Sequence, residues 1–300
     1  MRLAVVVGPT AAGKSALALR IAEAAGAEIV SADSQQVYRG MDVGTGKVSA
    51  AERARAPHHL IDVVDPDEEM TAARYAALAD EAIAGAAARG RSVVVAGGTG
   101  LYVRALMHGL FAGPPADAEL RARLAREDVG ALHERLRAVD PEAAARILPN
   151  DRRRLIRALE VHTLTGVPIS THQRTHDVRN APSRYPARWV GLDPPAAELR
   201  ARIAARVDAM LAAGFVDEVR RLAERYPLDL RAFDAIGYRE IGAHLRGEID
   251  LAAAREKTIA ATRRYARRQR GWFRAEPDVA WHESADSVDV PGLAAWLRPR

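Results

Sequence analysis

The 300-residue sequence contains no cysteine, only 5% aromatic residues and no long apolar run. Without cysteine the protein can form neither disulfide bonds nor thiolate metal sites, and it has no thiol nucleophile. The apolar run at the N-terminus ends at Gly8, which is too short for the core of a signal peptide, and no later run approaches the ~18 apolar residues of a membrane span. We therefore expect a cytoplasmic protein that does not associate with membranes.

Lysine is also scarce, because it supplies only Lys14, Lys47 and Lys257 of the 44 basic residues. The net charge of +5 permits a nucleic-acid partner, another polyanion or no anionic partner at all. Seven basic residues and no acidic residue lie within 257–274. If this segment is a helix, its arginines form a stripe that can follow a phosphate backbone. The stripe consists of Arg263, Arg267, Arg270 and Arg274, with Arg264 and Arg268 beside it.

Strands and helices alternate in the first part of the chain. Short apolar runs predict strands, and apolar residues at helical spacing predict helices between them. The expected order is strand 3–7, helix 15–25, strand 28–31, helix 71–89 and strand 92–96. Such alternation predicts an α/β fold, in which helices flank both faces of a parallel sheet.

After residue 113 the pattern becomes helical, with no convincing strand up to residue 187. A strand then returns at 188–192, helices follow at 195–212 and 216–225, and a long helix is expected over 251–273. We therefore expect an α/β core of residues 1–113 and 188–300, with an all-helical insertion at 114–187. The insertion helices are expected at 118–126, 131–138, 142–147 and 152–165.

The strongest local motif is G-x-x-x-x-G-K-[ST], and it stands between a predicted strand and a predicted helix, as a phosphate-binding loop requires. In such a loop the backbone amides at the helix N-terminus surround phosphate oxygens, the lysine adds a point charge and the hydroxyl binds Mg²⁺ or phosphate. The alternative is a glycine-rich turn with an incidental lysine. The motif consists of Gly8, Pro9, Thr10, Ala11, Ala12, Gly13, Lys14 and Ser15, with Ser15 as the candidate metal ligand.

The loop alone does not identify the phosphate compound. Nucleotide-hydrolysing enzymes with this loop hold Mg²⁺ with an acid that ends an apolar strand. Here the strand at 93–96 ends in a Gly-Gly-Thr-Gly turn, although Asp62 or Asp65 could supply the acid. These features argue moderately against a nucleoside triphosphatase.

Several further phrases accompany the phosphate loop. They are residues 31–42 with 44–45, 57–60, 97–102, 153–160, 237–240 and 267–272. Their succession resembles the bacterial tRNA dimethylallyltransferases over about 270 residues. The resemblance implies a P-loop NTPase-like sheet and an insertion domain that contacts tRNA. It also implies transfer of a dimethylallyl group from dimethylallyl diphosphate to the exocyclic amine of adenosine 37, with Mg²⁺ and release of diphosphate. We infer no obligate protein partner and expect a monomer.

The resemblance assigns chemistry to four residues. Thr10, Lys14 and Arg206 would stabilise the departing diphosphate, although Arg206 could equally be a solvated charge on a helix. Asp33 would orient and deprotonate the amine. It follows a strand at the carboxyl edge of the sheet, which places it near the phosphate loop if the two strands are neighbours. Without the resemblance, Asp33 is better explained as a turn or helix cap.

The resemblance also suggests residues that contact tRNA. They are Asp33, Ser34, Gln35, Gln36, Thr99, Arg121, Arg153, Arg154, Arg157, Gly237, Tyr238, Arg239, Arg264, Arg267, Arg268 and Gln269. Tyr265, Trp272 and Phe273 could stack on bases, but we expect them to anchor their helix to the core. His58 and His59 would point to opposite faces of a strand, so we expect hydrogen-bonded structural histidines rather than a metal site.

Three alternatives remain at this stage. An isopentenyltransferase that acts on free adenine nucleotides would have little use for two clusters of arginine. A small-molecule kinase would use the same phosphate loop but transfer phosphate from ATP. An RNA-binding GTPase-like switch would need a motif for guanine recognition, and the sequence has no obvious one.

Overall fold

The computed structural model describes residues 1–111, 113–175 and 182–298. The chain forms two compact units, one of residues 1–107 and 183–300 and the other of residues 108–182. Both boundaries of the second unit therefore lie a few residues before those of the predicted insertion, and its first residue is the last residue of helix α4 (Gly100–His108). Residues 176–181 of the predicted insertion lie outside the described residues.

The first unit is built on a sheet of six parallel strands in the order β3-β2-β4-β1-β5-β6. This arrangement confirms the predicted α/β fold. However, strand β4 lies between β1 and β2, so the two strands considered as possible neighbours do not pair with each other. The strands are β1 (Leu3–Val7), β2 (Glu28–Ser31), β3 (His58–His59), β4 (Val93–Ala96), β5 (Ala187–Leu192) and β6 (Val279–His282).

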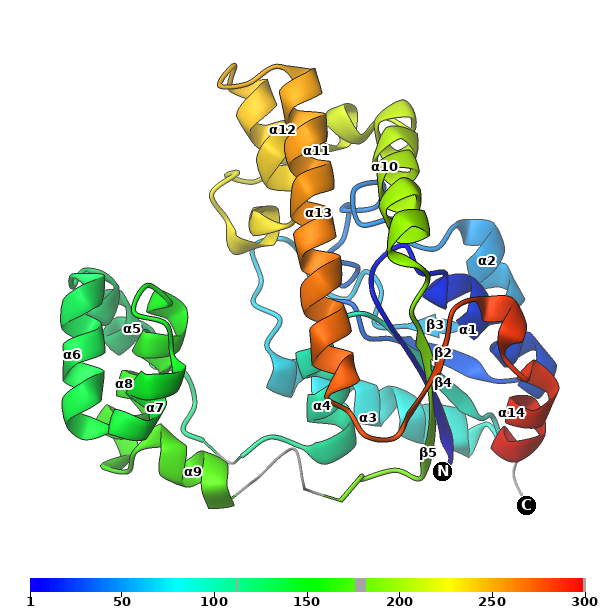
Figure 1. Cartoon of the computed structure of the whole chain (residues 1–300), viewed down its shortest axis with the longest axis horizontal. Coiled ribbons are helices and arrows are strands. Elements are labelled where there is room, and N and C mark those ends of the chain that lie inside the picture. Colours follow the sequence, from blue (N-terminus) through cyan, green and yellow to red (C-terminus); the bar gives the residue numbers. More distant parts are fainter. Residues whose placement is uncertain (112, 176–181, 299–300) are drawn as a thin grey trace. The chain divides into compact units, whose positions relative to one another are not determined.

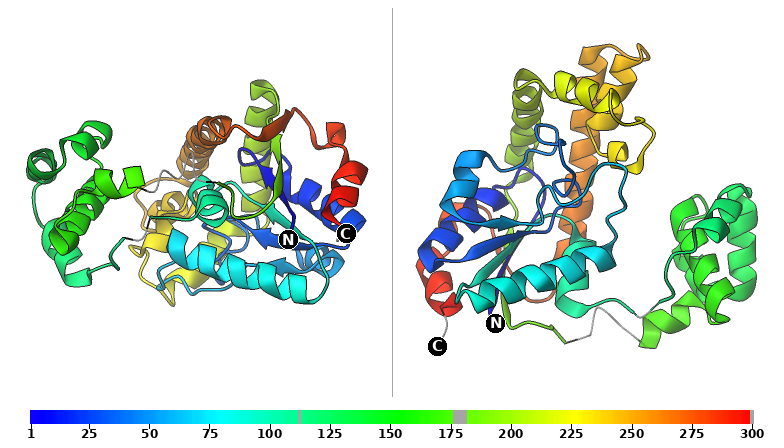
Figure 2. Two further views of the ribbon diagram at one scale, coloured as in Figure 1. Left: turned by 90° about the horizontal axis from the view of Figure 1, so that it is seen from below. Right: turned by 180° about the vertical axis from the view of Figure 1, so that it is seen from behind.

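Helices cover both faces of this sheet (Figure 2). The side chains of Leu3, Val5 and Val7 share one apolar cluster with helix α3 (Ala72–Ala88) and α4. Those of Ala4 and Val6 share another with helices α1 (Lys14–Ala25) and α14 (Val290–Leu297). Every residue of β1 is buried, which explains its uninterrupted apolar sequence.

A further group of helices extends from the carboxyl edge of the sheet (Figure 1). Helix α13 is the longest and packs against α10 and α12. Asp250 caps it by accepting a hydrogen bond from the amide of Ala253. None of the described helices is long and apolar enough to span a membrane. The remaining helices of this unit are α2 (Ala50–Arg55), α10 (Ala196–Ala212), α11 (Phe215–Ala223), α12 (Tyr238–Leu245) and α13 (Leu251–Arg274), with short 3₁₀ turns at Arg231–Asp234 and Ala285–Ser287.

The regular secondary structure in the described residues of the second unit consists of helices, which share their own apolar core. Four of its helices begin with an aspartate whose side chain accepts a hydrogen bond from a backbone amide in the first turn. The helices are α5 (Ala118–Ala125), α6 (Val129–Val139), α7 (Pro141–Arg146), α8 (Arg152–Thr165) and α9 (Ile169–Thr175). The first four match the predicted segments, whereas α9 was not predicted.

Candidate functional site

The phosphate loop joins β1 to α1 in a tight backbone turn. A side chain at Gly8 would place its Cβ 2.3 Å from the carbonyl oxygen of Leu192, so only glycine fits there. Gly13 has a φ of 95° and caps α1 without a side-chain hydrogen bond. The first amides of α1 therefore have no capping side chain, and an uncapped helix N-terminus favours an anion.

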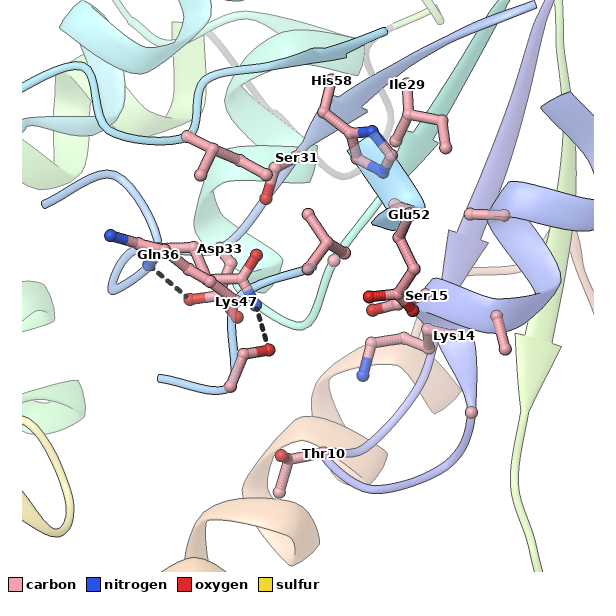
Figure 3. A pocket seen from close by; sticks show the side chains of 18 of the residues that line it. Thr10, Lys14, Ser15, Ile29, Ser31, Asp33, Gln36, Lys47, Glu52 and His58 are labelled. Carbon is pink, nitrogen blue, oxygen red and sulfur yellow. Dashed lines mark hydrogen bonds between the residues drawn. The ribbon is translucent and has the colours of Figure 1, made fainter. Parts of the chain in front are cut away.

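The loop opens into a cavity of about 290 Å³ at the carboxyl edge of the sheet (Figure 3). All four residues with an expected catalytic role line it, namely Thr10, Lys14, Asp33 and Arg206. Asp33 therefore faces the phosphate loop even though β4 separates their strands. Of the other loop residues, Ala11, Gly13 and Ser15 line the cavity, whereas Gly8, Pro9 and Ala12 shape the loop behind it.

Two cations in this cavity are shielded from water. Burial lowers the pKa of Lys14 to about 8, an effect that nearby Arg206 reinforces and Asp33 opposes. Burial also lowers the pKa of Arg206, and Asp33 again opposes the shift. The Lys14 ammonium donates a hydrogen bond to the carbonyl of Pro9 at 2.7 Å, and the Arg206 guanidinium donates one to the carbonyl of Thr45 at 3.2 Å. Their positive charge is offset only in part, so the cavity favours an anionic ligand.

Asp33 uses one oxygen to hold its own turn. Its Oδ1 accepts hydrogen bonds from the amides of Gln35 at 2.8 Å and Gln36 at 3.4 Å. Among the described residues, no donor is bound to its other oxygen, Oδ2. The capping role and the proposed chemical role are therefore compatible, because the cap fixes the carboxylate while leaving Oδ2 for a ligand.

The glycine turn after β4 supports this carboxylate. A Cβ at Gly97 would lie 2.1 Å from the carbonyl oxygen of Ala32, so the glycine allows close approach of the segment before Asp33. The Thr99 hydroxyl then accepts a hydrogen bond from the amide of Ser34 at 2.9 Å. Thr99 thus fixes the Asp33 turn.

Two functional residues were missed by the sequence analysis. Lys47 lines the cavity, and its buried ammonium donates to the carbonyl of Tyr38 and pairs with Asp42 and Asp62. The scarcity of lysine is the one signal that could have indicated Lys47. Because Asp62 also pairs with Arg53, it is already engaged as an ion-pair partner rather than an open metal ligand.

The second missed residue is Glu218, which is buried on α11. Its carboxylate accepts hydrogen bonds from the amides of Asp42, Val43 and Gly44 and from the hydroxyl of Tyr238. It therefore holds the loop that leads to Lys47. The sequence contains no signal for this role, since its pattern predicts that Glu218 is a solvent-exposed charge on an amphipathic helix.

Several predicted tRNA contacts have partners inside the protein. Tyr238 is 1% exposed and its hydroxyl is bound to Glu218, so this side chain is turned away from the surface. Gln36 is also buried, and its amide donates to the carbonyl of Gly46. The Arg239 guanidinium pairs with Glu240 but remains largely exposed, and Gly237 begins α12 with a φ of 94°.

The arginines of α13 divide into two groups. Arg270 and Arg274 both pair with the buried carboxylate of Asp193, which lies beside β5. The predicted stripe is therefore interrupted, because two of its charges are neutralised. Arg263, Arg264 and Arg267 are exposed, and no described acid lies within ion-pair distance of them or of Arg268, which stacks on the ring of Tyr265. Phe273 is buried in the main core and Trp272 packs against it, as expected for anchors.

In the second unit the arginines surround a fully buried acid. Arg121 and Arg157 both bind the carboxylate of Glu160, which also accepts a hydrogen bond from the amide of Asp117. These donors hold the pKa of Glu160 low despite its burial. Arg154 lies on the exposed side of α8 near Asp151, and Arg153 lies beside it on the same helix. Glu160 therefore orders two of the four arginines of this unit that are proposed to contact tRNA.

The histidines have the structural partners expected of them. The Nδ1 atom of His58 bonds to the carbonyl of Ala56 at 2.8 Å, and the Nε2 atom of His59 bonds to Glu28 at 2.6 Å. Across residues 1–111, 113–175 and 182–298, no three side chains of His, Asp or Glu form a metal-binding group. A Mg²⁺ site would instead use the Ser15 hydroxyl, which lines the cavity together with the carboxylates of Asp33 and Glu52. These oxygen donors fit a hard cation that takes its other ligands from phosphate and water.

The chain is similar to enzymes that transfer prenyl groups to tRNA. Residues 36–276 match the family model of IPP transferases. The chain is 57% identical to a tRNA dimethylallyltransferase of Anaeromyxobacter dehalogenans over all of both chains, and 51% identical to that of Symbiobacterium thermophilum over 93% of this chain and 88% of the relative. A tRNA isopentenylpyrophosphate transferase from Bacillus halodurans has a similar structure, with a TM-score of 0.72, 38% identity and coverage of 98% and 94%.

A eukaryotic dimethylallyltransferase acting on tRNA also superimposes, with a TM-score of 0.82, 27% identity and coverage of 95% of this chain and 74% of that one. The resemblance inferred from the sequence motifs is thus confirmed by full-length relatives as well as by structure. The family model over most of the chain and the full-length relatives show that the chain belongs to the IPP transferase family, whose matched members are named tRNA dimethylallyltransferases.

Proposed function

We propose that this protein transfers a dimethylallyl group from dimethylallyl diphosphate to the exocyclic amine of adenosine 37 in tRNA and releases diphosphate. The observation that carries the proposal is the cavity in which Lys14, Arg206 and the amides of the phosphate loop face Asp33. One side of this cavity suits an anionic leaving group, and the other suits an amine. The names of the relatives support this pairing of donor and acceptor.

The leaving group determines what the cationic side does. As the allylic carbon–oxygen bond breaks, negative charge grows on the diphosphate, so cations placed there bind the transition state more tightly than the ground state. Lys14 and Arg206 act in this way, and their partial burial strengthens the interaction because little water screens it. We also propose that Ser15 holds Mg²⁺, which supplies further positive charge to the diphosphate when bound.

The acceptor determines what Asp33 does. The amine of adenine is a weak nucleophile that must lose a proton as the carbon–nitrogen bond forms. Asp33 Oδ2 accepts that proton, since Oδ1 is held by the amides of Gln35 and Gln36. An adenine inside an anticodon loop must leave its stack to reach this carboxylate, and the polar side chains after Asp33 can hold it outside the stack.

The basic surface of α13 selects a folded RNA over a free nucleotide. Arg263, Arg264 and Arg267 are exposed without a described acidic partner, so they can bind backbone phosphates. The helical second unit supplies further arginines. We propose that the protein acts as a monomer in the cytoplasm, with tRNA and dimethylallyl diphosphate as its only required partners.

The proposal is tested by incubation with unmodified tRNA, dimethylallyl diphosphate and Mg²⁺, followed by mass analysis of the nucleosides. We expect an adenosine that carries one dimethylallyl group at position 37. Modification of free AMP but not of tRNA would instead identify an enzyme of free adenine nucleotides. Transfer of labelled γ-phosphate from ATP, with no use of dimethylallyl diphosphate, would identify a kinase.

Replacing Asp33 with alanine should lower kcat by about two orders of magnitude or more, because the general base is lost. Binding of tRNA, measured separately by filter retention, should change little. Asp286→Ala serves as the control, since that aspartate is exposed and Arg20 is its one ion-pair partner among the described residues. A wild-type kcat in the Asp33 variant would remove Asp33 from the mechanism.

The pKa of Lys14 predicts an alkaline limit to activity. The ammonium is charged below pH 8 and loses its proton as the pH rises through about 8, so kcat/KM for dimethylallyl diphosphate should fall tenfold per pH unit above that value. In Lys14→Arg the guanidinium stays charged at alkaline pH, so the lower activity of that variant should show no such fall. The same alkaline decline in both proteins would show that another group titrates.

Exchange of Arg264 and Arg268 for alanine should weaken tRNA binding. The plot of the logarithm of the tRNA association constant against the logarithm of the salt concentration should become less steep by about two, one for each lost phosphate contact. The affinity for inorganic diphosphate should be unchanged. The matched control is Arg20→Ala with Arg91→Ala, which removes two charges outside α13. Equal loss of tRNA affinity in both double variants would show a general charge effect rather than a binding surface.

A further inference from the structure

Gln269 occupies an unusual position on the basic helix α13. Although it lies between Arg268 and Arg270 in the sequence, its side chain is only 5% exposed. The resemblance placed it among the tRNA contacts. In the structure it is turned inward, away from the exposed arginines, and both ends of its amide are bound within the first unit.

The amide of Gln269 links the two loops that form the site. Its Oε1 accepts a hydrogen bond from the backbone amide of Thr10, in the phosphate loop, at 2.8 Å. Its Nε2 donates to the backbone carbonyl of Gly98, in the glycine turn after β4, at 2.8 Å. One planar group with a donor and an acceptor therefore sets the spacing of two loops.

The glycine turn is shaped to receive this helix. A Cβ at Gly98 would lie 2.1 Å from Nε2 of Gln269, and one at Gly100 would lie 2.2 Å from the indole ring of Trp272. Residues 269 and 272 are three apart and share one face of α13, so this face rests directly on the turn. A side chain at either glycine would collide with the helix.

The contact continues to the acceptor side of the cavity. Thr99 lies between Gly98, whose carbonyl binds Gln269, and Gly100, which Trp272 approaches closely. Thr99 in turn accepts the amide of Ser34, next to Asp33. The inner face of α13 is thus connected both to the loop proposed to hold diphosphate and to the turn that carries Asp33.

We propose that Gln269 is a positioning residue that fixes the phosphate loop against the glycine turn, and that it does not contact tRNA. It acts through Thr10 and Gly98 rather than on either substrate. This inference rests on the proposed function, since it assigns the phosphate loop to the diphosphate. Its consequence is that loss of the Gln269 amide impairs use of the diphosphate and leaves tRNA affinity intact.

The test compares Gln269→Met, which keeps the length of the side chain but has no hydrogen-bonding amide, with Thr262→Ala. Thr262 lies on the same helix, and its hydroxyl donates to the carbonyl of Thr258 and to no other described residue, so its loss should change nothing. In the methionine variant we expect kcat/KM for dimethylallyl diphosphate and the affinity for inorganic diphosphate to fall at least tenfold. The Kd for tRNA should stay within twofold of wild type.

Hydrogen exchange provides a second readout, because the Thr10 amide loses its acceptor in the variant and should exchange faster than in Thr262→Ala. If the methionine variant is unstable, Gln269→Asn, which is too short to span both loops, is measured in its place. A tenfold weaker tRNA affinity with unchanged diphosphate affinity would overturn the inference and make Gln269 an RNA contact. Unchanged affinity for both ligands, or parallel loss of both in a folded variant, would also overturn it.

Failure of the Gln269 inference can be distinguished from failure of the proposed function. Binding of inorganic diphosphate by wild type and variant requires no group transfer, so it tests the role of Gln269 even if no dimethylallyl adenosine forms. Conversely, wild-type protein that modifies tRNA, with diphosphate binding unaffected by the substitution, would leave the proposed function intact and remove only the positioning role.

Discussion

The structure depends on holding two partly desolvated cations and a carboxylate around one cavity. Lys14 and Arg206 lose hydration there, and Asp33 compensates that loss only in part. Without an anion such an arrangement is unfavourable, so the surrounding backbone must hold it in place. The tight turn at Gly8 and the hydrogen bonds from Glu218 to the loop before Lys47 provide that support. The rigid loops therefore keep the two cations in place for binding an anion.

Much of the architecture was predictable because local patterns of apolar residues determine it. Strand β1 and helix α8 have the predicted bounds, since one is wholly apolar and the other has a clear apolar period. Helix α9 and the segment from β6 to α14 were not predicted. Residues 169–175 are mostly polar, and β6 is short and lies at the edge of the sheet, so each depends on contacts with distant parts of the chain.

The site was predictable as a set of residue types but not as an arrangement. The motif identified Lys14, and the resemblance identified Asp33. Neither predicts that strand β4 lies between the strands that precede these two residues. Likewise, helical spacing put Arg270 and Arg274 on a basic stripe, but both are neutralised by Asp193, about 80 residues earlier in the chain. Side chains whose partners are distant in sequence carry no periodic signal, and this is why Glu218 was missed.

In the proposed reaction, helix α13 would serve both substrates. Its exposed arginines carry charge without specific geometry, as an RNA backbone requires, whereas its buried face carries Gln269, whose amide is held by two hydrogen bonds. The exposed face can bind RNA only in a manner compatible with the helix position that the buried face sets. Because that position is defined by contacts to the phosphate loop and to the glycine turn beside Asp33, an RNA docked on α13 as proposed would have its base placed relative to both proposed reacting groups.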